Sequence, residues 1–410
     1  MKSGAARVVI VGAGHAGGSM AALLRQYGWS GPITLIGAEA TLPYQRPPLS
    51  KMWLTGEADS ASLLQRPEHF YAAAGIDVRL GTRATQIDRA RCTVALADGE
   101  VINYDRLILA TGSQARQLAV PGHGLGNVHT LRTLADAERL KALLSPGACL
   151  AVIGAGYIGL EVAASANKLG VACVVIERER RVLARVASAP LSDYFQKRHT
   201  AAGVRIILDA AVEALEGTHD RVSAVRLTDG TMLKCDAALI GIGAAADTTL
   251  GHAAELACAD GIVVDLAART SDPAIHAIGD CTHRPLPHYG RTGRLESVPN
   301  AIEQAKQAAA DLCGRPPPAP EVPWFWSDQY QDRLQIAGLP LAAVETVVRG
   351  DPTSGTFAVF HLGEDCTVRA VEAVNAPAEF MAGRMMIQRR TKALADRLHD
   401  VSCSIREFVG

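Results

Sequence analysis

The sequence has no paired cysteines. Its nine cysteines are scattered over 410 residues, none stands in a Cys-x-x-Cys pair, and none precedes Cys92. An odd, dispersed set argues against a disulfide framework, and no cysteine has the spacing of a metal ligand. We therefore expect reduced thiols in a cytoplasmic protein, with no bound metal.

Net charge and long apolar runs are also lacking. The formal net charge is −1, so nothing global favours nucleic acid or an anionic membrane as a partner. No uninterrupted apolar run approaches the roughly 20 residues that span a bilayer. The composition, 48% apolar and 20% charged, is typical of a globular protein. A chain of this length is too long for one ordinary core, so we expect two or three domains.

Two segments repeat one pattern of strand, glycine turn, helix and second strand. The first begins with Val8–Val11 and continues through Gly12, Gly14 and Gly17 to Ile33–Ile36. The second begins with Leu150–Ile153 and continues through Gly154, Gly156 and Gly159 to Ala172–Ile176. Strands that alternate with helices at this spacing predict βαβ units on a parallel sheet.

The glycines in each copy have a specific use. The first permits a tight turn, the second lets a pyrophosphate approach the backbone, and the third lets the helix pack close to the strand. The start of the following helix offers free N–H groups to the phosphates. Two such copies predict two dinucleotides, as a flavin–nicotinamide enzyme requires.

Acidic residues follow both second strands. Glu177 ends the strand of the second copy, where a carboxylate can accept hydrogen bonds from ribose hydroxyls and repel a 2′-phosphate. This favours NADH over NADPH, although Arg178 beside it could reverse the preference. In the first copy Glu39 is the nearest acid, with a less certain register.

Two further strand ends carry polar residues. Asp280 follows Gly279 after the strand Ile275–Ile278, and Thr111-Gly112 ends the strand Leu107–Ala110. A Gly-Asp pair alone is more often a turn. Its place after the second nucleotide unit favours a carboxylate that accepts a ribityl hydroxyl of a flavin.

The remaining segments are expected to be mixed. Short antiparallel strands are predicted at Val78–Leu80, Thr93–Leu96 and Val101–Asn103. The proline-rich run Arg315–Pro320 marks a linker. Three strand-like runs and a helix follow it, as in an α+β domain; the runs are Leu334–Ala337, Val344–Val348 and Thr356–Phe360.

The order of these motifs resembles the FAD-dependent pyridine-nucleotide oxidoreductases, and over essentially the whole chain it resembles the ferredoxin reductases of oxygenase systems. The stretches that carry this resemblance are Pro43–Lys51, Val322–Tyr330, Glu296–Asn300 and Glu303-Gln304-Ala305. It implies an α/β fold with two Rossmann-like dinucleotide-binding domains, one inserted in the other, and an α+β C-terminal domain. The implied domains are FAD-binding (1–115 and 246–322), NAD-binding (116–245) and C-terminal (323–410).

The resemblance also implies site residues. The FAD contacts are Gly12, Gly14, Ala16, Lys51, Ala84, Arg132, Asp280 and Val298, with Trp324 and Trp326 near the isoalloxazine. The NAD contacts are Gly154, Gly156, Tyr157, Gly159, Glu161, Glu177 and Arg185. Lys51 and Glu161 are the candidates for tuning the flavin and for positioning the carboxamide of the nicotinamide. An acid often stands in the family where this chain has Ala38, so adenosine recognition is expected to fall to Glu39.

The implied activity is that of an NADH:ferredoxin reductase. Hydride passes from NADH to FAD, and single electrons pass to a [2Fe-2S] ferredoxin that feeds an oxygenase; the protein is expected to be a monomer or homodimer. Two alternatives are a reductase of rubredoxin or a small acceptor, and a redox-sensing interaction protein resembling apoptosis-inducing factor. The last would favour long insertions or basic tails, which this chain lacks. A dithiol relay is excluded after the first nucleotide unit because no cysteine stands there, and Cys281 is expected to be a packed thiol.

Overall fold

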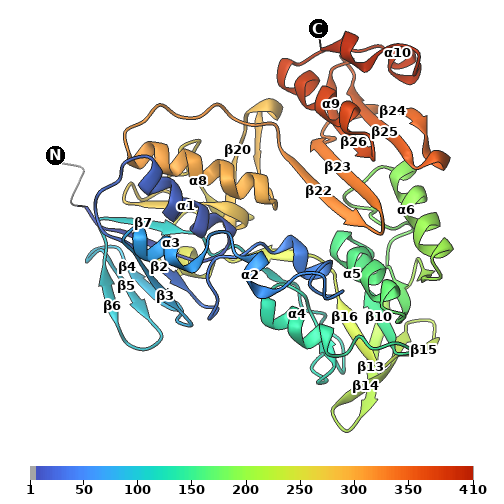
Figure 1. Cartoon of the computed structure of the whole chain (residues 1–410), viewed down its shortest axis with the longest axis horizontal. Coiled ribbons are helices and arrows are strands. Elements are labelled where there is room, and N and C mark those ends of the chain that lie inside the picture. Colours follow the sequence, from blue (N-terminus) through green and yellow to red (C-terminus); the bar gives the residue numbers. More distant parts are fainter. Residues whose placement is uncertain (1–5, 410) are drawn as a thin grey trace. The chain divides into compact units, whose positions relative to one another are not determined.

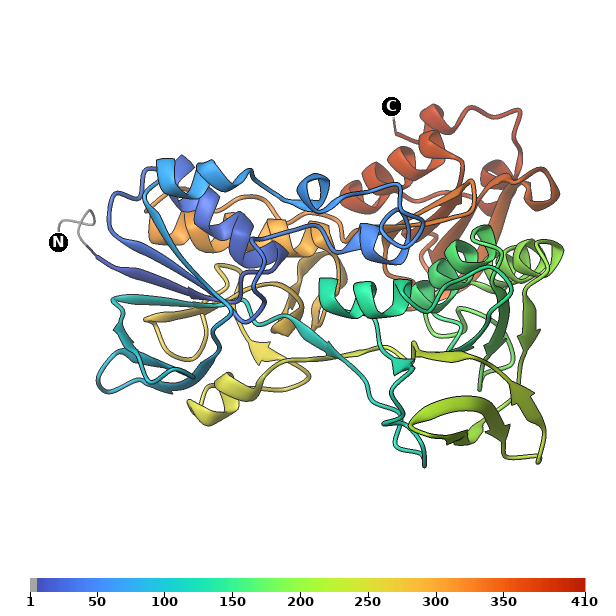
Figure 2. The same ribbon diagram turned by 60° about the horizontal axis from the view of Figure 1, so that its bottom comes forward.

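The computed structural model describes residues 6–409, which form two compact units (Figures 1 and 2). The first unit comprises the described residues up to Gln45 with Ser60–Gln114 and Ala245–Pro323. The second comprises Arg46–Asp59, Ala115–Ala244 and the described residues from Trp324 onward. Each unit contains one of the two predicted glycine loops.

A parallel sheet forms the centre of the first unit. Its strand order is β19-β7-β1-β2-β3, and all neighbouring strands run parallel. The strands are β1 (Val8–Val11), β2 (Ile33–Gly37), β3 (Ile76–Leu80), β7 (Arg106–Leu109) and β19 (Ile275–Ala277). β1 and β2 are buried along their whole length because both faces of the sheet are covered.

Successive residues of β1 pack into different cores. Val8 and Ile10 lie in a core with α1 (His15–Gln26) and α8 (Val298–Leu312), which pack against each other (Figure 1). Val9 and Val11 lie in a second core with the antiparallel sheet of β4 (Ala84–Asp88), β5 (Thr93–Leu96) and β6 (Val101–Asn103). This alternation is the period-two pattern of a strand.

One predicted strand is paired differently from our expectation. Val78–Leu80 belongs to β3, which runs parallel to β2 with Ile33 opposite Ile76. It therefore extends the nucleotide-binding sheet and does not join β5 and β6. Its alternating exposure is that of an edge strand, which resembles a half-exposed antiparallel strand in sequence.

The second unit contains a parallel sheet with the order β12-β11-β10-β16-β9. These strands are β9 (Val128–His129), β10 (Cys149–Ile153), β11 (Ala172–Ile176), β12 (Arg205–Ile207) and β16 (Ala237–Ile240). Its helices are α4 (Leu134–Lys141), α5 (Tyr157–Lys168) and α6 (Ala189–Ala201), and an antiparallel sheet contains β13 (Val212–Thr218), β14 (Arg221–Leu227) and β15 (Met232–Lys234).

The C-terminal part of the second unit is an antiparallel sheet with the order β22-β23-β26-β25-β24. The strands are β22 (Trp324–Gln329), β23 (Asp332–Gly338), β24 (Ala343–Asp351), β25 (Thr356–Gly363) and β26 (Val368–Val374). The helix α9 (Pro377–Arg389) packs on β23 and β26. Leu334 and Val359 of this sheet share one core with Val152 and Leu160, so this part packs on the region around α5.

The other elements are short. They are η1 (Pro47–Ser50), α2 (Ser60–Leu63), α3 (Glu68–Ala73), β8 (Ser113–Ala115), β17 (Ala244–Ala246), α7 (Thr249–Ala253), β18 (Ile262–Val263), η2 (Gly279–Cys281), β20 (Thr282–Leu286), η3 (Pro287–Tyr289), β21 (Arg291–Gly293), η4 (Pro352–Ser354), α10 (Ala395–His399) and η5 (Ile405–Phe408). Within residues 6–409, no helix is long and apolar enough to cross a membrane.

Candidate functional site

The first glycine loop joins β1 to α1, and two of its glycines are required by the backbone itself. Gly12 has φ +111°, and a Cβ there would lie 2.1 Å from the carbonyl oxygen of Ala110. A Cβ on Gly17 would lie 1.9 Å from the carbonyl oxygen of Gly12. Gly14 caps α1 without a side-chain hydrogen bond, and no acid stands in the first turn. The start of α1 therefore suits an anion.

The second loop joins β10 to α5 and repeats these constraints. Gly154 has φ +102°, and a Cβ there would lie 2.6 Å from the carbonyl oxygen of Gly241. A Cβ on Gly159 would lie 2.2 Å from the carbonyl oxygen of Gly154. Close packing thus requires both glycines.

Gly156 is different. Its φ of −78° and ψ of −179° suit any residue, and an added Cβ would meet one atom, the Gly241 oxygen, at 4.0 Å. Neither the backbone nor internal packing requires glycine here. A group that approaches the loop closely from outside does require it, as a pyrophosphate would. Because Gly156 also caps α5 without a side-chain hydrogen bond, the loop fits a dinucleotide.

Glu177 lies beside the second loop, half-buried at the end of β11. Its Oε2 accepts from the Ala155 N–H at 2.6 Å, and its Oε1 accepts from the Glu179 N–H at 3.0 Å. The Arg178 side chain is 76% exposed and pairs with Glu179. Arg181 donates to Ser192 and to two backbone carbonyl oxygens. Neither arginine is paired with Glu177 in these interactions.

Glu39 and Ala84 are both tied to the end of β2. The Glu39 Oε2 accepts from the Tyr44 hydroxyl at 2.7 Å. The Gly81 N–H donates to the Glu39 carbonyl, and the Thr82 N–H to that of Gly37. These bonds bring the segment that leads into buried Ala84, the first residue of β4, to the strand end where Glu39 stands.

Asp280 lies in η2, close to the start of α1. A Cβ on Gly279 (φ +81°) would be 3.0 Å from the Ala16 Cβ. The Gly279 N–H donates to the Gln304 Oε1 at 2.8 Å, and the half-buried Asp280 accepts from the Ser113 hydroxyl at 3.1 Å. We did not single out Ser113 or Gln304; the available signal was the place of Gln304 in the Glu303-Gln304-Ala305 motif.

Thr111 and Val298 lie at the ends of elements in the same unit. The Thr111 hydroxyl donates to the Asp247 carbonyl at 2.6 Å. Val298 is the first residue of α8, whose N-cap residue Ser297 accepts from the Asn300 N–H at 3.2 Å.

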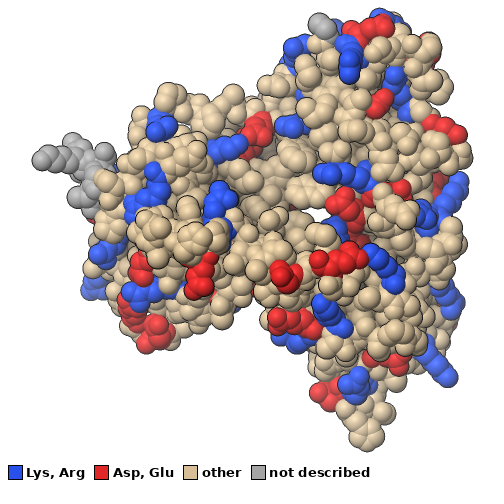
Figure 3. Space-filling model, viewed as in Figure 1, with Lys and Arg blue, Asp and Glu red and all other residues tan. Residues whose placement is uncertain are grey.

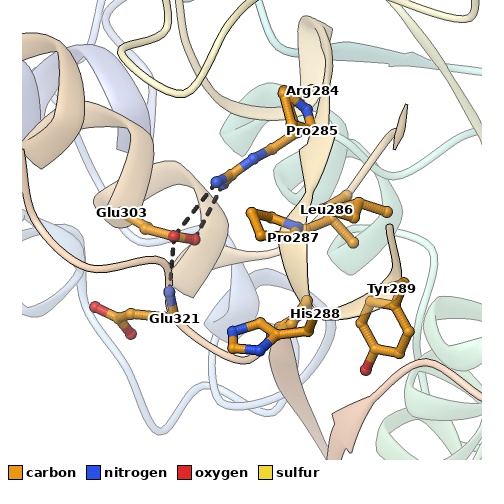
Figure 4. A pocket seen from close by; sticks show the side chains of 10 residues that line it. Arg284, Pro285, Leu286, Pro287, His288, Tyr289, Glu303 and Glu321 are labelled. Atoms are coloured by element: carbon orange, nitrogen blue, oxygen red, sulfur yellow. Dashed lines mark hydrogen bonds and ion pairs between the residues drawn. The ribbon is translucent and has the colours of Figure 1, made fainter. Parts of the chain in front are cut away.

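The helix α8 is anchored by a buried ion pair. Arg284 Nη1 lies 3.0 Å from Glu303 Oε2, and Glu303 also accepts from the Glu321 N–H (Figure 4). The cavity drawn there holds about 10 Å³, close to the minimum for one water molecule. Arg284 and Glu303 thus position α8, and this cavity is too small for a dinucleotide.

Lys51 and Glu161, the two candidates for tuning the flavin and positioning the carboxamide, form an ion pair. Their Nζ and Oε2 atoms are 2.6 Å apart, and the side chains are 17% and 3% exposed. Lys51 also donates to the Pro47 carbonyl at 3.0 Å. Glu161 projects from α5 just after the glycine loop, so the pair lies close to the second predicted dinucleotide site.

Two serines donate hydrogen bonds to the Glu161 carboxylate. Ser50 donates to Glu161 Oε2, and Ser327 donates to Oε1 at 2.6 Å. We did not predict either contact, although Ser50 precedes Lys51 and Ser327 follows Trp326 in the motifs quoted above. All four side chains belong to the second unit.

Arg132 and the predicted Trp324/Trp326 pair lie on two other segments of the second unit. Arg132 precedes the capping residue of α4, and its carbonyl accepts from Arg46 at 2.5 Å. The rings of Trp324 and Trp326 lie 5.7 Å apart on β22. The hydrogen bond from Arg46 connects Arg132 to the motif that contains Lys51.

Tyr157, the first residue of α5, contacts the loop that follows β11, and Arg185 lies within that loop. The Tyr157 hydroxyl donates to the Val186 carbonyl at 3.1 Å, and burial raises its pKa well above the usual value. Arg185 is exposed and donates to the Ile242 carbonyl at 3.4 Å, beyond the end of β16. Arg185 is thus presented at the carboxyl ends of the parallel strands, where ligands of such sheets bind.

Residues 6–409 contain no group of three or more His, Cys, Asp or Glu residues placed to hold a metal ion. Cys281 is fully buried, and burial raises the pKa of its thiol, which donates to the Ile278 carbonyl at 3.3 Å. These properties agree with the predicted packed thiol.

Known proteins resemble the chain over its full length. Residues 6–305 match the pyridine nucleotide-disulphide oxidoreductase family, and residues 324–409 match a reductase C-terminal family. A probable ferredoxin reductase, CtmF, of Castellaniella defragrans is 50% identical over 395 residues, which cover 96% of each chain. Putidaredoxin reductase CamA of Pseudomonas putida is 42% identical over 407 residues, 98% of this chain and 96% of the relative.

A solved structure shares the fold. The reductase in the covalent putidaredoxin reductase–putidaredoxin complex superposes with a TM-score of 0.96 at 42% identity, covering 99% of this chain and 98% of that one. The predicted α/β fold with two Rossmann-like domains and an α+β C-terminal domain is confirmed. The chain belongs to the pyridine nucleotide-disulphide oxidoreductase family and is an oxidoreductase that uses FAD and a pyridine nucleotide.

Proposed function

We propose that this protein is an NADH-dependent ferredoxin reductase whose acceptor is a [2Fe-2S] ferredoxin that feeds an oxygenase. The observation that carries the proposal is a pair of glycine loops on separate parallel sheets, each opening a helix that has no side-chain cap. The names of the relatives support the acceptor, since several are ferredoxin reductases and one solved relative is bound to putidaredoxin.

The two nucleotides are assigned to different parts of the chain. Residues 1–115 and 246–322 bind FAD, residues 116–245 bind NADH, and residues 323–410 form the C-terminal domain. The compact units support only the coarser separation, because 116–245 and the C-terminal residues share one core.

The FAD site combines the first loop with polar strand ends. Its phosphates would bind at the start of α1, beside Gly12, Gly14, Ala16 and Gly17. Glu39 and Ala84 would contact the adenosine, and Asp280 would accept a hydrogen bond from a ribityl hydroxyl. Thr111 and Val298 would line the remainder, and the family resemblance assigns further FAD contacts to Arg132 and Trp326.

The NADH site combines the second loop with Glu177 and Arg185. Gly154 and Gly159 allow the close packing of the loop. Gly156 would let the pyrophosphate approach the start of α5, and Tyr157 and Glu161 lie on the same helix. The Glu177 carboxylate accepts from ribose hydroxyls and would repel a 2′-phosphate, which makes NADH the preferred donor. The bond that its Oε2 accepts from Ala155 fixes the carboxylate beside the loop.

A bound flavin would supply the hydride-accepting and single-electron chemistry, and the protein would supply position and electrostatics. Lys51 holds a positive charge on Nζ, which stabilises negative charge nearby. Glu161 orients that ammonium through a 2.6 Å contact. Ser50 and Ser327 hold the carboxylate in turn.

The test is a steady-state assay of the purified, yellow protein with NADH or NADPH against a panel of acceptors. We expect a [2Fe-2S] ferredoxin to be reduced faster than rubredoxin or a quinone, and NADH to be used in preference to NADPH. Faster reduction of rubredoxin would favour the second candidate, which a rubredoxin-NAD(+) reductase of Pseudomonas putida, 42% identical over 331 residues, also supports. A wild-type protein that binds no flavin would refute both.

The nine unpaired cysteines support a reducing compartment, and we assign the protein to the cytoplasm as a monomer or homodimer. Sedimentation of the loaded protein distinguishes the two oligomeric states.

A further inference from the structure

A continuous chain of hydrogen bonds leads away from the Glu161 carboxylate. Ser327 Oγ donates to Glu161 Oε1 at 2.6 Å, and Gln329 Nε2 donates to Ser327 Oγ at 3.2 Å. Gln329 Oε1 lies 2.9 Å from His199 Nε2, and His199 Nδ1 lies 3.1 Å from the Tyr330 hydroxyl. The chain thus connects α5, β22 and α6, all within the second unit.

The middle of this chain is closed to water. Ser327, Gln329 and His199 are buried, so each polar atom depends on its neighbour in the chain. Burial lowers the pKa of His199 to about 4, so the imidazole is neutral near pH 7, donating with one nitrogen and accepting with the other. Donation to Gln329 Oε1 assigns the proton to Nε2, and Nδ1 then accepts from Tyr330.

All four bonds therefore point the same way. Tyr330 donates to His199, His199 to Gln329, Gln329 to Ser327 and Ser327 to Glu161. Hydrogen bonds arranged in series polarise one another, so the last donor binds a carboxylate more firmly than an isolated hydroxyl does. The charged partner on the other carboxylate oxygen is Lys51, while Arg198 and Asp332, paired at 2.9 Å, are the charges next to His199.

The conformation of Tyr330 supports a role for this end of the chain. Tyr330 stands in the turn between β22 and β23 with φ +57°, a left-handed conformation that hairpin turns usually fill with Asn, Asp or Gly. A bulky residue there is strained. Its ring lies 4.9 Å from the His199 ring and 4.9 Å from the Arg198 guanidinium, so the strained residue presents its hydroxyl to His199.

We propose that Gln329 and His199 are positioning residues that act through Ser327 to orient the Glu161 carboxylate, and thereby the Lys51 ammonium. The inference rests on the proposed function, in which the Lys51 ammonium tunes the flavin. Without this chain of hydrogen bonds, Glu161 Oε1 loses its polarised donor. The carboxylate then turns, or it holds the Lys51 ammonium more tightly. The Lys51 ammonium then stabilises negative charge on the flavin less.

The experiment compares Gln329→Leu and His199→Phe with His199→Gln, whose side-chain amide can again donate to Gln329. Asn127→Leu is the matched control, because Asn127 is a buried amide of the same unit that bonds to Val222 and lies outside the chain. Three quantities are measured on the FAD-loaded protein: the rate of flavin bleaching by NADH in stopped flow, the flavin midpoint potential and the melting temperature.

We expect Gln329→Leu and His199→Phe to slow bleaching about fivefold, the effect of losing roughly one hydrogen bond, and to make the potential more negative. His199→Gln should recover most of the rate. Asn127→Leu should lower the melting temperature without changing the rate or the potential. Tyr330→Phe removes one hydroxyl only, and it should shift the potential in the same direction by less.

Two results would overturn the proposal. One is a wild-type rate and potential in both Gln329→Leu and His199→Phe, or in Tyr330→Phe if those do not fold. The other is a ¹⁵N spectrum, assigned by the signal missing from His199→Gln, that places the proton of His199 on Nδ1. A wild-type flavin that NADH does not bleach would instead refute the proposed function and this role together.

Discussion

Single residues acquire their properties here from their partners. Glu161 is 3% exposed, yet its carboxylate contacts one ammonium and two hydroxyls. A buried charge without such partners is costly, so each member of the group depends on the others. Lys51 and Glu161 should therefore behave as one unit in both stability and activity.

We predict that Lys51→Met destabilises the protein by about 3 kcal/mol, because it leaves the buried Glu161 carboxylate uncompensated. Adding Glu161→Gln should restore part of that stability. The same variants should slow flavin bleaching non-additively, with the double variant little worse than either single one. Urea unfolding and stopped flow measure the two effects, and strictly additive losses in both would mean that the residues act independently.

A second residue-scale prediction concerns pH. The folded protein holds the pKa of His199 at about 4, below the usual 6.5, because burial disfavours the imidazolium. The unfolded chain therefore binds the extra proton first as pH falls. The stability linked to neutral His199 is complete above about pH 6.5 and is lost progressively down to about pH 4, by at most about 3 kcal/mol.

The measurement is urea unfolding of the wild type and His199→Gln at several values between pH 7.5 and 4.5. The stability difference between the two proteins should shrink as pH falls, because a glutamine side chain does not titrate. A difference that stays constant over this range would show that His199 does not contribute to the acid sensitivity.

At the scale of elements, the glycine loops show that one residue type serves two purposes. Gly154 and Gly159 are glycines because the backbone of a neighbouring segment lies within 2.6 Å of where a Cβ would stand. Gly156 has neither a positive φ nor a close neighbour. The helix α5 would form with alanine at 156, whereas the approach of a ligand would be blocked.

We predict that Gly156→Ala folds with a loss of at most about 1 kcal/mol, the cost of alanine at a helix N-cap. Its KM for NADH should nevertheless rise at least about tenfold, equivalent to roughly 1.4 kcal/mol of lost binding. Gly159→Ala is the contrasting variant, and it should express poorly or unfold because its Cβ would lie 2.2 Å from a backbone oxygen. Unchanged NADH binding by Gly156→Ala, with normal FAD content, would contradict the assignment of the second loop.

At the scale of the whole molecule, net charge is near zero and both signs are interspersed over the face drawn in Figure 3. Basic residues are frequent between Arg178 and Arg205 and could attract a partner protein. Several of them already bind other side chains, such as Arg181 with Ser192 and Arg198 with Asp332. Near the end of α9, Arg389 donates to the Val409 carbonyl, whereas Arg390 and Lys392 are exposed. Arg390 and Lys392 are therefore the better candidates for docking the proposed ferredoxin.

We predict that reduction of ferredoxin falls as salt rises to physiological levels, because charges are screened beyond about 8–10 Å. Arg390→Glu with Lys392→Glu should weaken that salt dependence and slow ferredoxin reduction at low salt. Reduction of ferricyanide, which needs no docked protein, should change little. Arg91→Glu, an exposed arginine of the first unit, is the control, and an equal loss there would indicate a general charge effect rather than docking.

Much of the fold follows from local pattern. The strand, glycine turn and helix that begin at Val8 and at Leu150 appear where the spacing predicts them, because period and turn chemistry are properties of adjacent residues. The runs at Leu334, Val344 and Thr356 are likewise strands β23, β24 and β25. We missed β22 and β26, since strand pairing depends on partners distant in the sequence and the aromatic start of β22 has no clear alternation.

The sequence by itself determined the two dinucleotide loops, the acid at Glu177 and the choice of Lys51 and Glu161, because each of these stands in a short motif. Only the tertiary structure decided which side chains surround Glu161. Ser50 and Ser327 stand 111 and 166 positions from it and meet it through the packing of η1 and β22 around α5. The chain of hydrogen bonds through Gln329 and His199 could not be predicted from the sequence either. A hydrogen bond between distant segments requires the folded backbone to bring donor and acceptor within about 3 Å.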